Sequence, residues 1–147
     1  MIQVRSKVFE TNSSMTHSLV ICENNEYTNW LPSNDKELPE GKTKNDYFLF
    51  SASNSDFLPY EEAIKKNVEY LFNELENDCL DDDVTKEDIE EYAKGNKSLA
   101  EVTEDLYELY LTEEEFEDNY YYYEVEPFKY TLKSGVKIEG FCYFGHD

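Results

Sequence analysis

Cysteines and long apolar runs are both scarce in this sequence. The three cysteines, Cys22, Cys79 and Cys142, are odd in number and unmatched in spacing, which indicates free, buried thiols in a reducing compartment rather than a disulfide scaffold. No apolar run approaches the roughly 18 residues of a transmembrane helix, and residues 1–22 contain no uninterrupted apolar segment of the signal-peptide kind. We therefore expect a cytoplasmic protein.

Glycine and the usual cofactor motifs are scarce as well. The chain has five glycines and contains no Walker loop, no dinucleotide-binding glycine motif and no His-Glu-x-x-His sequence. The cysteines and the histidines His17 and His146 form no Cys-x-x-Cys or His-x-x-x-His pair. Asp81, Asp82 and Asp83 are adjacent, whereas an EF-hand loop needs alternating ligands. We expect no cofactor and no metal, and the sequence favours a non-catalytic protein over an enzyme.

Positive charge is the largest deficit. The chain has 13 Lys and Arg residues against 34 Asp and Glu residues, for a formal net charge of −21. Residues 69–126 hold 22 of the acidic residues and only three basic ones, Lys86, Lys94 and Lys97, so this acidic segment carries −19. A charge of this sign repels nucleic acid and anionic membranes, so we expect neither as a direct partner. A basic protein is the electrostatically natural partner.

Aromatic residues, in contrast, are abundant at 16% of the chain, and they supply apolar area that a disordered acidic chain lacks. A chain of 147 residues fits a single domain. Apolar residues at spacings of three and four predict acidic helices over about residues 59–79, 86–94 and 99–111, with a short helical turn after Thr112. Capping-box pairs stand at the predicted starts of the later elements: Thr85 with Asp88, Ser98 with Glu101, and Thr112 with Glu115.

Strands are predicted at both ends of the chain. Two β-prone runs flank the polar segment of residues 10–17, and alternation around Ser134-Gly135 predicts a second hairpin with a two-residue turn. Residues 47–50 predict a buried strand, and the long loop before them carries Trp30 as an anchor. We predict an α+β fold, in which an antiparallel sheet from the N- and C-terminal segments carries the acidic helices on one face.

The most unusual local sequence is the polar box of residues 10–18. Val8-Phe9-Glu10-Thr11-Asn12-Ser13-Ser14, followed by His17-Ser18, resembles the opening of a group of small uncharacterised proteins from bacteriophages and mobile elements. The resemblance implies a setting, the cytoplasm of a host cell, and it implies no activity.

The polar box itself admits three interpretations. Its hydroxyl groups could stabilise a tight turn by bonding their own backbone. They could instead form a phosphate- or nucleotide-binding loop. In an enzyme, His17 could act as the base for Ser13 or Ser14, with Glu10 orienting the imidazole. The candidate ligand-loop residues are Glu10, Asn12, Ser13, Ser14 and His17.

The acidic segment offers a different mechanism, because carboxylates on the outward faces of helices can approximate a row of phosphates. A helix rises about 1.5 Å per residue, and duplex DNA carries about one charge per 1.7 Å of axis. The tyrosines of residues 120–123 admit two uses: those exposed beside carboxylates could bind Arg and Lys through cation–π contacts, or all four could be partly buried in the sheet. The candidate partner-binding residues are Glu87, Asp88, Glu90, Glu91, Glu101, Glu104, Asp105, Glu108, Glu113, Glu114, Glu115, Glu117, Asp118, Tyr121 and Tyr123.

In size and charge the chain resembles the DNA-mimic inhibitors that phages deploy against restriction enzymes and CRISPR effectors. The leading hypothesis is a non-catalytic inhibitor that blocks a basic nucleic-acid-binding host protein. A generic acidic interaction module and a ligand-binding protein or enzyme that uses the polar box remain as alternatives. Halophilic adaptation would make the whole chain acidic, whereas Lys129, Lys133 and Lys137 leave the C-terminal hairpin mildly basic.

Overall fold

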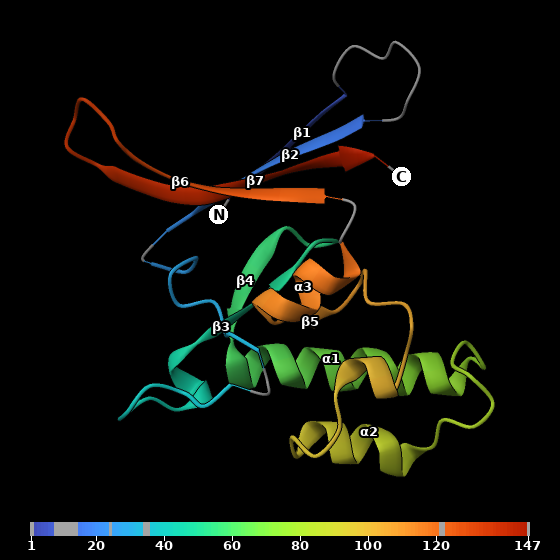
Figure 1. The fold of residues 1–147 in the computed structure, drawn as a ribbon. Coiled ribbons are helices and arrows are strands. Elements are labelled where there is room, and N and C mark those ends of the chain that lie inside the picture. Colours follow the sequence, from blue (N-terminus) through green and yellow to red (C-terminus); the bar gives the residue numbers. More distant parts are fainter. Residues whose placement is uncertain (1, 8–14, 24, 34–35, 121–122, 147) are drawn as a thin grey trace.

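The fold consists of two antiparallel sheets and three α-helices within the residues that the computed structural model describes, 2–7, 15–23, 25–33, 36–120 and 123–146 (Figure 1). This confirms the predicted α+β class. The larger sheet has the strand order β1-β2-β7-β6, in which β1 is Ile2–Lys7, β2 is Met15–Cys22, β6 is Tyr123–Thr131 and β7 is Lys137–His146. Because β2 pairs with β7, the sheet is built from both ends of the chain, as predicted.

The hairpin of β6 and β7 closes through a longer turn than predicted. The N–H of Leu132 donates to the carbonyl oxygen of Val136 at 2.8 Å, and the N–H of Gly135 donates to the carbonyl oxygen of Leu132 at 2.8 Å. The turn therefore contains three residues, 133–135, between the hydrogen-bonded residues Leu132 and Val136. The prediction of a hairpin is confirmed, and the prediction of a two-residue turn is wrong.

A smaller sheet lies beneath the larger one in Figure 1. Its strand order is β4-β3-β5, in which β3 is Phe48–Ser51, β4 is Asp56–Pro59 and β5 is Tyr110–Leu111. Leu49 and Phe50 are buried, which confirms the buried strand predicted for residues 47–50. β4 and β5 are not among the predicted strands.

Two of the three predicted helices are confirmed. α1 spans Tyr60–Glu76 and α2 spans Lys86–Ala93, inside the predicted ranges 59–79 and 86–94. The helical turn predicted after Thr112 is α3, Glu113–Asn119. All three helices lie on one side of the four-stranded sheet (Figure 1). The small sheet lies between the four-stranded sheet and α1, and α3 is the helix nearest to the four-stranded sheet.

The helix predicted over residues 99–111 is wrong. Only Leu99–Glu101 forms a helical turn, the 3-10 helix η2. Beyond it, the Thr103 hydroxyl accepts the N–H of Asp105 at 3.2 Å, and the Asp105 carboxylate accepts the N–H of Tyr107 at 3.1 Å. These side chains compete with the helical hydrogen-bond ladder. The apolar residues of the segment are still buried, namely Leu99, Val102, Leu106 and Leu109, because they pack into the core from an irregular backbone.

The core is centred on Trp30, which confirms the predicted anchor. The indole is 4% exposed, and its Nε1–H donates to the carbonyl oxygen of Leu111 at 2.9 Å. Its ring centroid lies within 5.5 Å of those of four phenylalanines, Phe50, Phe57, Phe116 and Phe141. These rings come from the small sheet, α3 and the large sheet, so Trp30 joins the layers in one core.

The three cysteines are free. Cys22 is buried, and burial raises the pKa of its thiol to about 12, which keeps it in the unreactive protonated form. Cys79 is exposed and Cys142 is half-buried, so the prediction of buried thiols is right only for Cys22. Among the described residues, no helix has the length and apolar character needed to cross a bilayer.

Candidate acidic interface

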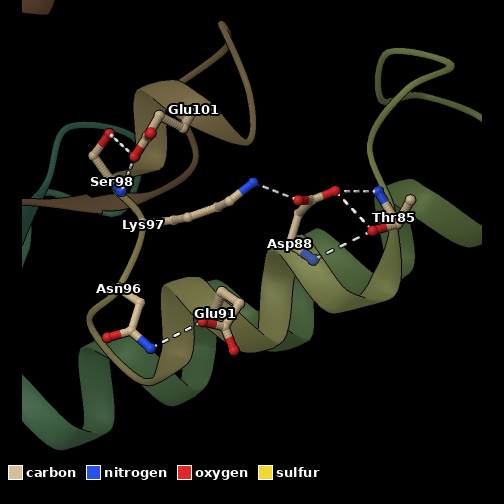
Figure 2. A network of polar contacts seen from close by, with 7 residues as sticks. All are labelled: Thr85, Asp88, Glu91, Asn96, Lys97, Ser98 and Glu101. Atoms are coloured by element: carbon tan, nitrogen blue, oxygen red, sulfur yellow. Dashed lines mark hydrogen bonds and ion pairs between the residues drawn. The ribbon is translucent and has the colours of Figure 1, made fainter.

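The first turn of α2 is fixed by the predicted capping box. The Asp88 carboxylate accepts hydrogen bonds from the backbone N–H and the hydroxyl of Thr85, both at 2.7 Å, and the Thr85 hydroxyl accepts the N–H of Asp88 at 3.4 Å. The same carboxylate forms an ion pair with Lys97 (Figure 2). The hydrogen bonds from Lys97 and Thr85 lower the pKa of Asp88 to about 2. Asp88 is therefore ionised at neutral pH, and its charge is compensated within the chain.

The turn after α2 uses a second carboxylate. Glu91 accepts a hydrogen bond from the Lys94 ammonium group at 2.9 Å. It also accepts one from the Asn96 side-chain amide at 2.9 Å (Figure 2). The contact with Lys94, and then that with Asn96, lowers the pKa of Glu91. Gly95 has a φ of 84°, in the left-handed region that favours glycine, and this lets the chain reverse directly after the helix.

The two other predicted capping boxes are also confirmed. Glu101 accepts the backbone N–H of Ser98 at 2.8 Å and its hydroxyl at 3.1 Å, and these bonds lower the pKa of Glu101. Glu115 accepts the N–H of Thr112 at 2.9 Å, and the Thr112 hydroxyl accepts the N–H of Glu115 at 3.1 Å. The starts of η2 and α3 are thereby fixed by carboxylates of the acidic segment.

Several candidate carboxylates thus serve contacts inside the chain. Besides the capping residues, Glu108 accepts the Ser53 hydroxyl at 2.6 Å and Asp105 accepts a backbone N–H. The candidates engaged in this way are Asp88, Glu91, Glu101, Asp105, Glu108 and Glu115. Glu113 is half-buried, and burial followed by the charge of Glu117 raises its pKa. These carboxylates stabilise local structure through their contacts inside the chain, so they are less available to a partner than the unpaired carboxylates.

Six other candidate carboxylates are exposed and have no hydrogen-bond or ion-pair partner among the described residues: Glu87, Glu90, Glu104, Glu114, Glu117 and Asp118. Glu87 and Glu90 are three positions apart on α2, and Glu114 precedes Glu117 and Asp118 by three and four positions on α3. Residues at these spacings share a helix face. Each helix therefore presents its unpaired carboxylates on one side.

The part of the predicted phosphate-like row that depended on a third helix does not exist. Glu101, Glu104, Asp105 and Glu108 lie on a 3-10 turn and an irregular segment, so their spacing is not that of a helix face. The segment from α2 through η2 to α3 rises along the molecule from its lower end toward the four-stranded sheet in Figure 1. Among the candidate partner-binding residues, carboxylates at helical spacing lie on α2 and α3.

Two hollows meet at Lys97 and Glu101, which line both. The first, an acidic groove of about 230 Å³, is lined also by Asp81, Asp83 and Glu104. Within the described part of the chain, no three His, Cys, Asp or Glu side chains are arranged to hold a metal ion. The second, the aromatic cavity, has a volume of about 300 Å³ and is lined by Leu31, Lys44, Leu49, Tyr60, Ile64, Tyr92, Gly95, Asn96, Lys97, Ser98, Glu101, Thr112 and Glu115.

Of the two tyrosines proposed from the sequence, Tyr121 and Tyr123, the structure describes only Tyr123. Tyr123 is half-buried, with its ring centroid 5.9 Å from those of Tyr120 and Tyr143, so part of it belongs to the aromatic core. Tyr121 lies outside the described residues.

The predicted ligand loop also lies outside the described residues, since it includes Glu10, Asn12, Ser13 and Ser14. The backbone of His17 belongs to β2, where it pairs with Phe144. The candidate ligand loop therefore stays a prediction.

Sequence patterns missed the contacts between distant segments. Lys97 follows Asp88 by nine positions, which matches no helical spacing, and Ser53 reaches Glu108 from the turn between β3 and β4. The aromatic cavity was equally hidden, because its walls come from six separate parts of the chain. Comparison with known proteins adds no family assignment: no protein-family model, curated protein or solved structure matches this chain.

Proposed function

We propose that this protein is a non-catalytic inhibitor that mimics nucleic acid and blocks a basic nucleic-acid-binding protein, such as a CRISPR effector or a restriction nuclease. The observation that carries the proposal is the set of exposed, unpartnered carboxylates on two capped helices, inside a segment with a charge of −19. A surface of this kind attracts the lysines and arginines that line a nucleic-acid channel.

The spacing of these carboxylates supports collective action on one basic surface. Side chains three or four positions apart on a helix have their Cβ atoms about 5–6 Å apart. This is shorter than the Debye length of about 8 Å at physiological ionic strength. Neighbouring carboxylates such as Glu114, Glu117 and Asp118 therefore act on a partner's cation together.

Rigidity supports the proposal as well. The capping boxes at Thr85 and Thr112, and the ion pair of Asp88 with Lys97, hold α2 and α3 in place before any partner arrives. A preorganised surface loses little conformational entropy on binding, so more of its electrostatic attraction contributes to affinity.

The experiment is a competition assay. The candidate partners are purified restriction nucleases and CRISPR effectors, together with basic proteins that the immobilised chain captures from bacterial cytoplasm. Each partner is titrated with fluorescent DNA or RNA in the presence of this protein. We expect the protein to displace the nucleic acid and to lose affinity steeply as the salt concentration rises. Binding that is indifferent to both salt and nucleic acid would refute the proposal.

A matched pair of variants separates the surface from the total charge. The test variant carries Glu87→Gln, Glu90→Gln, Glu114→Gln and Glu117→Gln. The control removes the same charge from exposed residues elsewhere, through Glu37→Gln, Glu40→Gln, Glu61→Gln and Glu62→Gln. We expect the test variant to lose competition and the control to keep it; equal losses would show that α2 and α3 are not the binding surface.

A further inference from the structure

The aromatic cavity lies where the acidic segment meets the rest of the fold. Tyr60 stands at the start of α1, Tyr92 near the end of α2, and Glu115 in the first turn of α3. Leu31, Leu49 and Ile64 add apolar surface to the lining. Its volume of about 300 Å³ is at the lower end for ligand sites, which suits one side chain better than a nucleotide.

A cation already contacts an aromatic wall of this cavity. The Nζ atom of Lys44, from the 3-10 helix Lys44–Asp46, lies 5.8 Å from the ring centroid of Tyr60, within the distance of a cation–π contact. Among the described residues Lys44 has no carboxylate partner in an ion pair. Lys44 also lies beside Gly95, just after the C-terminal end of α2, because a Cβ atom placed on Gly95 would be 3.5 Å from Nζ of Lys44. The helix dipole favours a cation at that end.

The charged lining residues of the cavity are Lys44, Lys97, Glu101 and Glu115. Because Lys97 is paired with Asp88, outside the lining, two carboxylates face Lys44, the single cation of the lining that has no ion pair among the described residues. Glu101 and Glu115 are both held by their capping contacts. Burial, and then the charge of Glu115, raises the pKa of Tyr60. Burial is also the main cause of the raised pKa of Tyr92, and the charge of Glu115 adds to it. The field of Glu115 thus reaches two of the aromatic side chains that form the cavity.

We propose that the aromatic cavity binds an arginine side chain of the protein partner, whose guanidinium group takes the place of the Lys44 ammonium group over Tyr60. A guanidinium group is planar, stacks on aromatic rings and is more weakly hydrated than an ammonium group, so it is the better occupant of a partly apolar cavity. This inference rests on the proposed function for the source of the arginine. Lys44 acts as an internal competitor that the partner displaces.

The test uses the full chain and a partner-free probe. The ¹⁵N-labelled protein is titrated with N-acetyl-arginine amide, and amide shifts are followed at Tyr60, Gly95 and Ser98. We expect saturable shifts there, and tighter binding by several-fold in Lys44→Ala, which removes the competing cation. Lys42→Ala, an exposed lysine outside the cavity lining, should leave the affinity unchanged.

Substitutions of Tyr60 test the aromatic wall. Tyr60→Phe keeps the ring and should retain binding, whereas Tyr60→Leu should weaken binding by roughly 2- to 30-fold, the range of one cation–π contact. Circular dichroism spectra establish that each variant is folded. If Tyr60→Leu does not fold, the comparison of Lys44→Ala with Lys42→Ala still decides the matter.

Two results would overturn this inference. One is the absence of saturable shifts at the cavity amides in Lys44→Ala. The other is binding of an uncharged or anionic probe at the same amides as tightly as the arginine probe. The uncharged probe is N-acetyl-glutamine amide, and the anionic probe is N-acetylglutamate. Neither result touches the proposed function, which is judged separately by salt dependence and competition with nucleic acid in the α2 and α3 variants.

Discussion

The side-chain amide of Asn67 binds both backbone groups of Tyr110. Its Oδ1 accepts the N–H of Tyr110 and its Nδ2 donates to the carbonyl oxygen of Tyr110, each at 2.8 Å. Nδ2 also donates to the hydroxyl of Tyr92 at 2.9 Å. Asn67 is 1% exposed, so this side chain of α1 is buried. It bonds β5 through both backbone groups of Tyr110, as a neighbouring strand would, and it also bonds α2 through Tyr92.

Replacing Asn67 with leucine should therefore destabilise the protein. The change leaves the N–H and the carbonyl group of Tyr110 without these partners in the core, and each unsatisfied buried group costs about 1–3 kcal/mol. We expect a loss of about 2–5 kcal/mol in the free energy of unfolding, measured by urea denaturation. Asn73→Ala, at an exposed position of the same helix, serves as the control. Equal stability of the two variants would contradict the role of Asn67.

The ion pair of Asp88 predicts a defined response to acid. The hydrogen bonds from Lys97 and Thr85 lower the pKa of Asp88 from 3.8 to about 2. A lowered pKa in the folded state stabilises the protein above the ordinary pKa, and this contribution disappears as the pH falls through about 2. The urea midpoint of Asp88→Asn should thus lie below that of the wild type at about pH 5, and the gap should close toward about pH 2.

The control for Asp88 is Glu87→Gln in the same helical turn. This change removes an equal charge from a residue that contacts neither Thr85 nor Lys97. It should not reproduce the pH-dependent gap. A gap of constant size between wild type and Asp88→Asn across the acid range would show that the carboxylate does not act through its ionised form.

Gly140 marks a point of close approach between β2 and β7. A Cβ at this position would lie 1.9 Å from the carbonyl oxygen of Val20, a distance that requires the backbone to move. Gly140→Ala should therefore lower the free energy of unfolding by about 3 kcal/mol or more, and it should reduce amide-exchange protection in both strands. Ser134→Ala, in the exposed turn of the β6 and β7 hairpin, should change stability by less than about 0.5 kcal/mol.

The last turn of α3 is predicted to be electrostatically unfavourable. Glu117 and Asp118 lie near the negative end of the helix dipole, and no basic residue accompanies them in that turn. Glu117→Gln with Asp118→Asn should raise the stability by about 0.3–1 kcal/mol per charge at low ionic strength, measured by thermal unfolding. Glu114→Gln, in the first turn, should give no such gain. If Glu117 and Asp118 contact a basic partner, the stabilised variant will bind it less well.

Local sequence signals predicted the elements that depend on neighbouring residues. The capping pairs at Thr85, Ser98 and Thr112 are all present, and α1, α2 and the buried strand β3 lie within or close to their predicted ranges. Capping and short apolar periodicity are properties of a few adjacent positions, so one sequence is sufficient to reveal them.

Contacts between distant segments could not be predicted in the same way. Residues 99–111 have helical spacing, yet Asn67 and β3 draw Tyr110 and Leu111 into a strand, because satisfying buried backbone groups outweighs a weak helical propensity. The pairing of Asp88 with Lys97 and the cavity beside Tyr60 depend on the same long-range packing.

The pairing of β2 with β7 has a consequence for how the chain folds as it is synthesised. Its register joins Met15 to His146 and Cys22 to Glu139, so the central pair of the large sheet is among the most non-local contacts that the chain can make. Contacts of this kind form slowly, because a long loop must close first. While the C-terminal strand is still in the ribosome, one edge of β2 has no neighbour to cover it, and such an edge is prone to pair with other chains. The strong negative charge of the segment in between would then keep nascent chains apart until β7 arrives.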